Sequence, residues 1–148
     1  MIDHIDHVGI AVVSIDQARG FYEALGLSIH AVEEVTSEGV RVALIQCGKS
    51  KIELLEATSE ESPIAKFIDR RGPGLHHICL STDSIDSDSD SLRRSGYELL
   101  RPIPTRGAGG CWVQFIHPKI AGGVLVELSQ AEEIRVPTGR VIGEIGEA

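Results

Sequence analysis

The sequence predicts an α+β protein made of two paired βαβββ units. The first observation behind this prediction is an internal repeat with an offset of 70 residues. The matched positions are His7, Ser14, Ile15, Asp16, Tyr22 and Gly26 in the first half and His77, Ser84, Ile85, Asp86, Leu92 and Gly96 in the second. The second observation is the order of elements in each half, which reads as a strand, a helix and three strands. The third is an acid in the last apolar strand of each half, Glu53 in KIELL and Glu127 in LVELS.

The first half begins with an apolar, β-rich strand that leads into a well-marked helix. Ser14 and Gln17 have the spacing of a capping box, and Gly26 is a helix stop. The apolar positions between them recur at helical spacing, as Ala18, Phe21, Tyr22 and Leu25. The predicted elements are a strand at 5–13, this helix, and strands at 27–35, 40–47 and 51–55, with turns at 36–39 and 48–51.

A second helix is predicted at 62–71. Ser62 is its expected cap, Pro63 takes the first helical position, and the segment Gly72-Pro73-Gly74 ends it. Because this helix has no counterpart in the second half, we interpret it as the connector between the two units.

The second half repeats the order of the first. The predicted elements are a strand at 75–82, a helix at 84–95 and strands at 97–101, 111–117 and 123–129, with a loop at 102–110. The helix is predicted from the place of Ser84 in the repeat, because its sequence is very polar and only Ile85 and Leu92 can face a core. The units therefore cover about 4–56 and 74–130 of a single domain at 1–131, and 132–148 form a C-terminal tail.

Composition excludes several classes of partner. The chain has 148 residues, 42% of them hydrophobic, and a formal net charge of −8, which argues against nucleic acid because phosphate binding needs a basic face. Its three cysteines form no CxxC pair, which favours reduced thiols in a cytoplasmic protein. No signal peptide or apolar run of membrane length is present, so we expect a soluble protein without a membrane partner.

Two adjacent histidines stand in the strand GLHHICL, and the repeat decides between them. Neighbours on a strand point to opposite faces, so only one of His76 and His77 faces inward. His77 matches His7 of the earlier strand DHVGIAV, and His76 is therefore expected to point away from the candidate site.

Two histidines and two glutamates at equivalent places in the repeats indicate a divalent metal site. An acid between apolar residues costs several kcal/mol to bury without a partner. An outward position on a half-exposed strand would explain Glu53 or Glu127 singly, but it does not explain why both recur with His7 and His77. Imidazole and carboxylate ligands suit Co, Ni, Zn, Mn or Fe better than Ca, and four protein ligands leave two octahedral positions open for substrate.

These features resemble the vicinal oxygen chelate superfamily and, within it, the methylmalonyl-CoA epimerase branch. The resemblance runs from residue 6 to about 130 and is carried by the segments DHVGIAV, KIELLEA, SPIAKFI, GLHHICL, FIHPK and GGVLVEL. It implies a curved mixed sheet around the metal, with His7, His77 and Glu127 as ligands and Glu53 where many members have Gln. It also implies a homodimer and an acyl-CoA substrate. Arg70, Arg71, Arg106 and Lys119 are candidate coenzyme A contacts.

The reaction that this resemblance implies is the interconversion of (R)- and (S)-methylmalonyl-CoA. A proton leaves C2 to give a metal-stabilised enolate and returns on the opposite face. Glu127 is the expected base on one face and Glu53 on the other. The well-described relatives carry a glutamate in the third strand where this chain has Val42, so Glu33, Glu34 and Glu38 stay open as substitutes for the second base.

Two other functions remain open from the sequence. A glyoxalase I type isomerase acting on a glutathione hemithioacetal fits two His and two Glu equally well, although the SPIAKFI and GGVLVEL segments favour the epimerase. A non-catalytic small-molecule-binding protein of the same fold is disfavoured because all four ligand positions are retained. An extradiol dioxygenase is disfavoured because its site normally has two His and one Glu.

Overall fold

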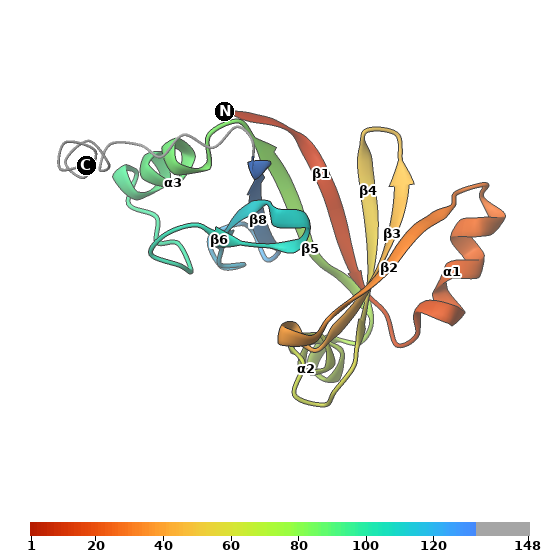
Figure 1. Cartoon of the computed structure of the whole chain (residues 1–148). Helices are drawn as coiled ribbons and strands as arrows, with labels where there is room; N and C mark the ends of the chain where they lie inside the picture. The colour runs from red at the N-terminus through yellow and green to blue at the C-terminus, as the bar shows by residue number, and fades with distance from the viewer. Residues whose placement is uncertain (133–148) are drawn as a thin grey trace, which may run out of the picture. The chain divides into compact units, whose positions relative to one another are not determined.

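The secondary structure follows the predicted order of two βαβββ units joined by a connector helix (Figure 1). The computed structural model describes residues 1–132. Its elements are β1 (Ile2–Ala11), α1 (Ile15–Ala24), β2 (Ile29–Val35), η1 (Thr36–Glu38), β3 (Val40–Cys47), β4 (Ser50–Ala57), α2 (Pro63–Arg71), β5 (Gly74–Thr82), α3 (Ile85–Arg94), β6 (Thr105–Arg106), η2 (Ala108–Gly110), β7 (Trp112–Ile116) and β8 (Leu125–Gln130). The α+β class is therefore confirmed. In the described part of the chain, no helix is long and apolar enough to span a membrane.

The chain divides into two lobes, and β1 and β5 each run from one lobe into the other. The first lobe is Ile5–Cys79, and the second comprises Met1–His4 and the chain from Leu80 onward. In the first lobe the strands lie in the order β2-β3-β4-β1-β5. There β1 and β4 are parallel, while β3 is antiparallel to both β2 and β4, so this sheet is mixed. In the second lobe the order is β5-β8-β7-β6, with β7 antiparallel to its two neighbours.

The first-lobe sheet buries one side against α1 and the other against α2. Leu54 belongs to the cluster that contains Ala18 and Tyr22 of α1. Its neighbour Leu55 belongs to the cluster that contains Ile64 of α2. Because successive strand residues face opposite ways, Glu53 shares the α2 side with Leu55, and His7 and Gly9 share it with Ala11. The candidate residues of this lobe therefore lie on the α2 side of the sheet.

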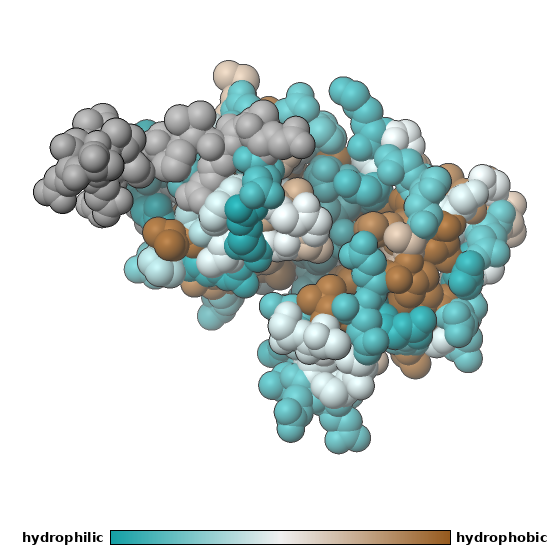
Figure 2. Space-filling model, in the orientation of Figure 1, coloured by the Kyte–Doolittle hydropathy of each residue, from teal (hydrophilic) through white to brown (hydrophobic). Residues whose placement is uncertain are grey.

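Helix α1 has the predicted caps but a narrower apolar contact than its sequence suggests. The Ser14 side chain accepts a hydrogen bond from the Gln17 N–H, which confirms the predicted cap. Phe21 and Leu25 are 65% and 63% exposed. At about 100° per residue, Phe21 lies roughly a quarter turn from the buried side, and Leu25 follows the last helical residue. Two of the four apolar positions at helical spacing therefore face solvent, and apolar atoms are exposed in the region of α1 and β2 (Figure 2).

Helix α3 forms as the repeat predicts, despite its polar sequence. Ile85 is fully buried, and Leu92 packs against the cluster of Ile116 and Leu128. At the start of the helix, the Ser84 side chain makes no capping hydrogen bond. Instead the Ser84 N–H donates to the Thr82 hydroxyl at 3.0 Å. Tertiary packing and a neighbouring hydroxyl thus replace the local signals that the polar sequence lacks.

The predicted strand at 97–101 was wrong. The Leu100 N–H donates a hydrogen bond to the Phe115 carbonyl of β7 at 3.0 Å, and the Arg101 carbonyl accepts one from the Gln114 side chain. Pro102 cannot donate to a ladder. Pairing with β7 therefore begins at β6, within the predicted loop. Cys47 is exposed at the end of β3. Most of the predicted tail lies outside the described residues.

Candidate metal centre

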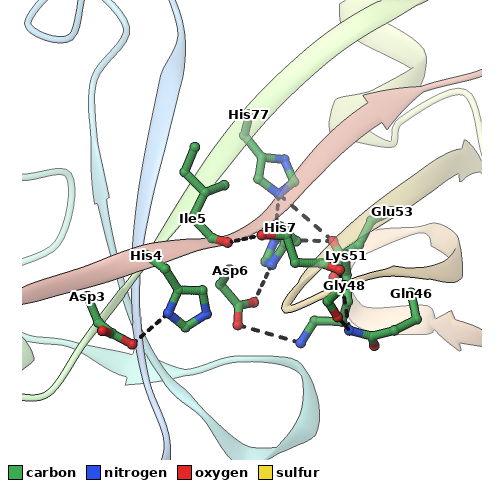
Figure 3. A network of polar contacts seen from close by, with 11 residues as sticks. Asp3, His4, Ile5, Asp6, His7, Gln46, Gly48, Lys51, Glu53 and His77 are labelled. Atoms are coloured by element: carbon green, nitrogen blue, oxygen red, sulfur yellow. Dashed lines mark hydrogen bonds and ion pairs between the residues drawn. The ribbon is translucent and has the colours of Figure 1, made fainter.

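The two histidines that the repeat matches meet inside the first lobe. His7 on β1 and His77 on β5 are 7% and 8% exposed. Their Nε2 atoms are 3.0 Å apart, and the rings meet edge to face. Figure 3 shows the two imidazoles pointing toward one another from neighbouring strands. Alternation along β5 thus brings His77, rather than its neighbour, to His7.

Glu53 approaches both imidazoles from β4. Its Oε2 atom is 3.3 Å from the His7 Nε2 and 3.9 Å from the His77 Nε2. Its side chain is 15% exposed. The parallel register of β1 and β4 sets Glu53 beside Gly9, two residues beyond His7. Three potential ligand atoms therefore converge on one small volume (Figure 3).

The spacing of these atoms fits a divalent metal. Metal–ligand distances of about 2.1 Å separate neighbouring ligand atoms by about 3.0 Å in an octahedron and about 3.4 Å in a tetrahedron. Of the three observed separations, 3.0 and 3.3 Å lie in this range and 3.9 Å lies slightly above it. Two imidazole nitrogens and a carboxylate oxygen are ligands that Zn, Co, Ni and Mn accept.

Asp6 fixes the orientation of His7. The His7 Nδ1–H donates to the Asp6 Oδ2 at 2.8 Å, and the Lys51 ammonium lies 3.5 Å from the other carboxylate oxygen. The hydrogen bond from His7, assisted by Lys51 and opposed by burial, lowers the pKa of Asp6 below its usual value. Asp6 is therefore an anion that can only accept, so the lone pair of a neutral His7 lies on Nε2, the atom facing His77 and Glu53.

His77 is neutral and contacts His76 through its other nitrogen. Burial, together with His7 and His76, lowers the pKa of His77 to about 3. Its Nδ1 lies 2.9 Å from the Nδ1 of His76, whose ring packs edge to face on Phe67 of α2. Burial, and then the charge of Arg71, lowers the pKa of His76 as well. The sequence predicts that His76 points away from the site, and the structure places it against the Nδ1 atom of His77, on the side of the ring opposite to the Nε2 that faces His7.

Gly9 makes room for the His77 ring, a role that the sequence analysis missed. A Cβ atom at position 9 would lie 2.2 Å from the Cε1 atom of His77 and 2.8 Å from its Nε2. Glycine inside a strand is a signal of close approach by a neighbouring group, and this signal was available in DHVGIAV. Asp6 and His76 were also missed as partners, although both directly precede a histidine of the repeat.

The remaining predicted positions are Glu127, Val42 and three glutamates of the first half. Glu127 is on β8 of the second lobe, where it pairs with Phe115 of β7. Val42 pairs with Leu55 and packs into the α2 cluster, so this position of β3 offers no acid. The three substitutes for a second base, Glu33, Glu34 and Glu38, are all exposed.

Comparisons with known proteins identify relatives of this chain in sequence and in fold. A family model described as the Glyoxalase/Bleomycin resistance protein/Dioxygenase superfamily matches residues 6–115. The chain is 37% identical over 132 residues to the human mitochondrial methylmalonyl-CoA epimerase, covering 88% of this chain and 75% of the relative. It is 39% identical over 133 residues to an ethylmalonyl-CoA/methylmalonyl-CoA epimerase of Cereibacter sphaeroides, covering 88% and 99% of the two chains. A solved variant of the Streptomyces coelicolor methylmalonyl-CoA epimerase, bound to 2-nitronate-propionyl-CoA, matches with a TM-score of 0.83 and 35% identity, covering 93% of this chain and all of that chain.

Proposed function

Because the chain belongs to the methylmalonyl-CoA epimerase family of the glyoxalase/bleomycin resistance protein/dioxygenase superfamily, we propose that it is an isomerase that interconverts (R)- and (S)-methylmalonyl-CoA. The observation that carries this proposal is the convergence of His7, His77 and Glu53 in a chain that resembles these epimerases along 88% of its length. The substrate class follows from the same relatives, whose names are those of acyl-CoA epimerases.

The proposed ligands of a divalent metal are His7, His77, Glu53 and Glu127, with Co, Ni, Zn or Mn as candidates. The contacts of the first three within one lobe support their part. For Glu127 the support is the repeat, since β8 is the neighbour of β5 in the strand order as β4 is of β1. When bound, the metal supplies a positive charge that stabilises the anion formed when the C2 proton leaves.

The chain's own acids carry the proton transfers in this proposal. The proton at C2 lies between a thioester and a carboxylate, and epimerisation requires its removal from one face and delivery to the other. The Glu127 carboxylate removes the proton on one face, and Glu53 serves the opposite face. The assignment of Glu53 is supported by its place beside the paired histidines, by the apolar Val42 and by the exposure of Glu33, Glu34 and Glu38.

The remaining parts of the proposal concern assembly and location. A homodimer is the expected assembly, because β2 is an edge strand whose backbone groups are available for pairing. A cytoplasmic location is supported by the cysteine pattern, because the three cysteines of the chain include no CxxC pair and suit a reducing compartment.

Proton NMR in deuterated water tests the function directly. We expect the metal-loaded protein to exchange the C2 proton of methylmalonyl-CoA faster than protein treated with EDTA. Replacement of Glu127 by Gln removes the proposed base of one face and is expected to abolish exchange of the epimer whose C2 proton points to that face. Glu98→Gln, a change of the same type at an exposed position, is the matched control and should leave the exchange unchanged. Absence of exchange with Co, Ni, Mn and Zn, together with turnover of a methylglyoxal–glutathione hemithioacetal, would replace the epimerase by a glyoxalase I type isomerase.

A further inference from the structure

The side chains level with Glu53 on β3 and β2 are apolar. Leu44 lies between Ala43 and Ile45, which pack in the cluster of α1, so strand alternation turns Leu44 to the α2 side. The antiparallel register pairs Leu44 with Glu53 of β4 and with Ala31 of β2. Directly opposed residues of this kind have Cβ atoms about 4.5–5.5 Å apart. Leu44 is therefore the cross-strand neighbour of Glu53.

The row of side chains that contains Glu53 changes from apolar to polar along the sheet. In the strand order β2-β3-β4-β1 this row is Ala31, Leu44, Glu53 and Gly9. The Glu53 carboxylate approaches His7 and His77, which stand on β1 and β5 (Figure 3). Leu44 and Ala31 thus lie on the side of Glu53 away from the paired histidines.

The core under α2 does not use the whole of this apolar strip. Val42, in the next row of β3, pairs with Leu55 and packs into the α2 cluster. In the described part of the chain, Leu44 is not a member of that cluster, and its side chain is half-buried. Leu44 therefore keeps part of its apolar surface beside the Glu53 carboxylate.

The groups on C2 of the proposed substrate match the two sides of Glu53. The thioester and the carboxylate bear oxygens, which suit the side of the histidines. The proton is the group that Glu53 handles in the proposed function. The alkyl substituent is bonded to the same carbon, so it also lies close to Glu53, and apolar surface is its favourable surrounding.

We propose that Leu44, together with Ala31, forms the wall that receives the alkyl substituent at C2, and that the size of Leu44 limits the substituent accepted. Leu44 is then a specificity residue that contacts the substrate and takes no part in proton transfer. This inference rests on the proposed function, because it concerns the same substrate.

Two substitutions change the wall in opposite directions. Leu44→Ala enlarges the space and should raise kcat/KM for ethylmalonyl-CoA relative to methylmalonyl-CoA by about 10-fold or more, the usual discrimination for one methylene in an apolar pocket. Ala31→Leu fills the space and should lower this ratio. Leu44→Met keeps the volume and should leave the ratio close to that of the unaltered protein. Leu25→Ala, the same change at a position that is 63% exposed, is the matched control.

The assay follows deuterium exchange at C2 by NMR with both acyl-CoA substrates competing in one sample. The ratio of the two rates gives the ratio of kcat/KM, and it does not depend on how much of a variant is folded or loaded with metal. If Leu44→Ala fails to fold, Ala31→Leu on the edge strand β2 carries the same test. The proposal is overturned if the folded variants exchange both substrates in the ratio of the unaltered protein. Absence of exchange of both substrates by the unaltered protein is instead a failure of the proposed function, and the wall fails with it.

Discussion

Replacement of Gly9 by Ala is predicted to damage the site through a steric clash. The added methyl group would lie 2.2 Å from the Cε1 atom and 2.4 Å from the Nδ1 atom of His77. To reach 3.4 Å, the lower end of ordinary van der Waals contact, the ring must move by about 1.2 Å. Gly9 has an ordinary φ angle that other L residues also adopt. The predicted effect of alanine is therefore steric rather than conformational.

That movement should lower both metal affinity and stability. The Nε2 atoms of His7 and His77 are 3.0 Å apart, so a ring displaced by about 1 Å no longer holds its lone pair at the position it shares with His7 and Glu53. We expect a loss of zinc affinity of about 100-fold, similar to the cost of a 1 Å misplacement at a catalytic centre. Overpacking should lower the free energy of unfolding by about 1–3 kcal/mol.

The assay compares Gly9→Ala with Gly20→Ala by chelator competition and urea denaturation. Gly20 lies within α1, and an added Cβ there would meet no atom within 4 Å. Its replacement should leave zinc affinity unchanged and raise stability by about 0.5–1 kcal/mol, because alanine favours helix. If Gly9→Ala binds zinc as the unaltered protein does, the packing of His77 against Gly9 does not hold the site in place.

Three further predictions address Glu53, His77 and Glu56. Glu53→Gln retains an oxygen ligand and should bind zinc within about 10-fold of the affinity of the unaltered protein, whereas Glu53→Leu should lose more affinity. Equal losses in a dye competition assay would show that the side-chain oxygen at position 53 is not a ligand. The pKa of His77 is lowered from 6.5 to about 3, so between these pH values the metal-free unfolded chain binds more protons than the folded protein, and the free energy of unfolding should fall as the pH drops. His77→Gln should flatten this pH dependence in urea titrations, and an unchanged dependence would refute a lowered pKa at His77. The Glu56 carboxylate caps α1 by accepting from the Ile15 N–H at 3.2 Å, and it also accepts from Arg41 at 2.8 Å. Glu56→Ala should therefore cost about 1–2 kcal/mol of stability in thermal unfolding, and Glu56→Gln should cost less. Equal costs would argue against the capping role of Glu56.

Local signals and the repeat were sufficient to predict most elements. The caps of α1 and α2 depend on residues within one turn, which is why Ser14 and Ser62 could be identified from the sequence. The meeting of His7 and His77 was also predictable, because strand alternation and a fixed offset act over the whole repeat. Position in the repeat even outweighed the polar composition of α3.

The misses share a dependence on contacts that are distant in sequence. The segment at 97–101 has the length of a strand, but Gln114 and Pro102 prevent a regular ladder with β7. The ring contact of His76 with Phe67 depends on where α2 lies, which strand alternation does not describe. Gly9 has meaning only once His77 is beside it, because the space it leaves is filled from another strand.

Conversion of a single epimer tests the central claim most directly. Pure (S)- or (R)-methylmalonyl-CoA would be supplied to the metal-loaded protein, and a mutase specific for the other epimer would report its formation. The account predicts product that depends on the metal and disappears in Glu127→Gln. Exchange of the C2 proton without formation of the other epimer would contradict it, because proton return would then occur on one face only.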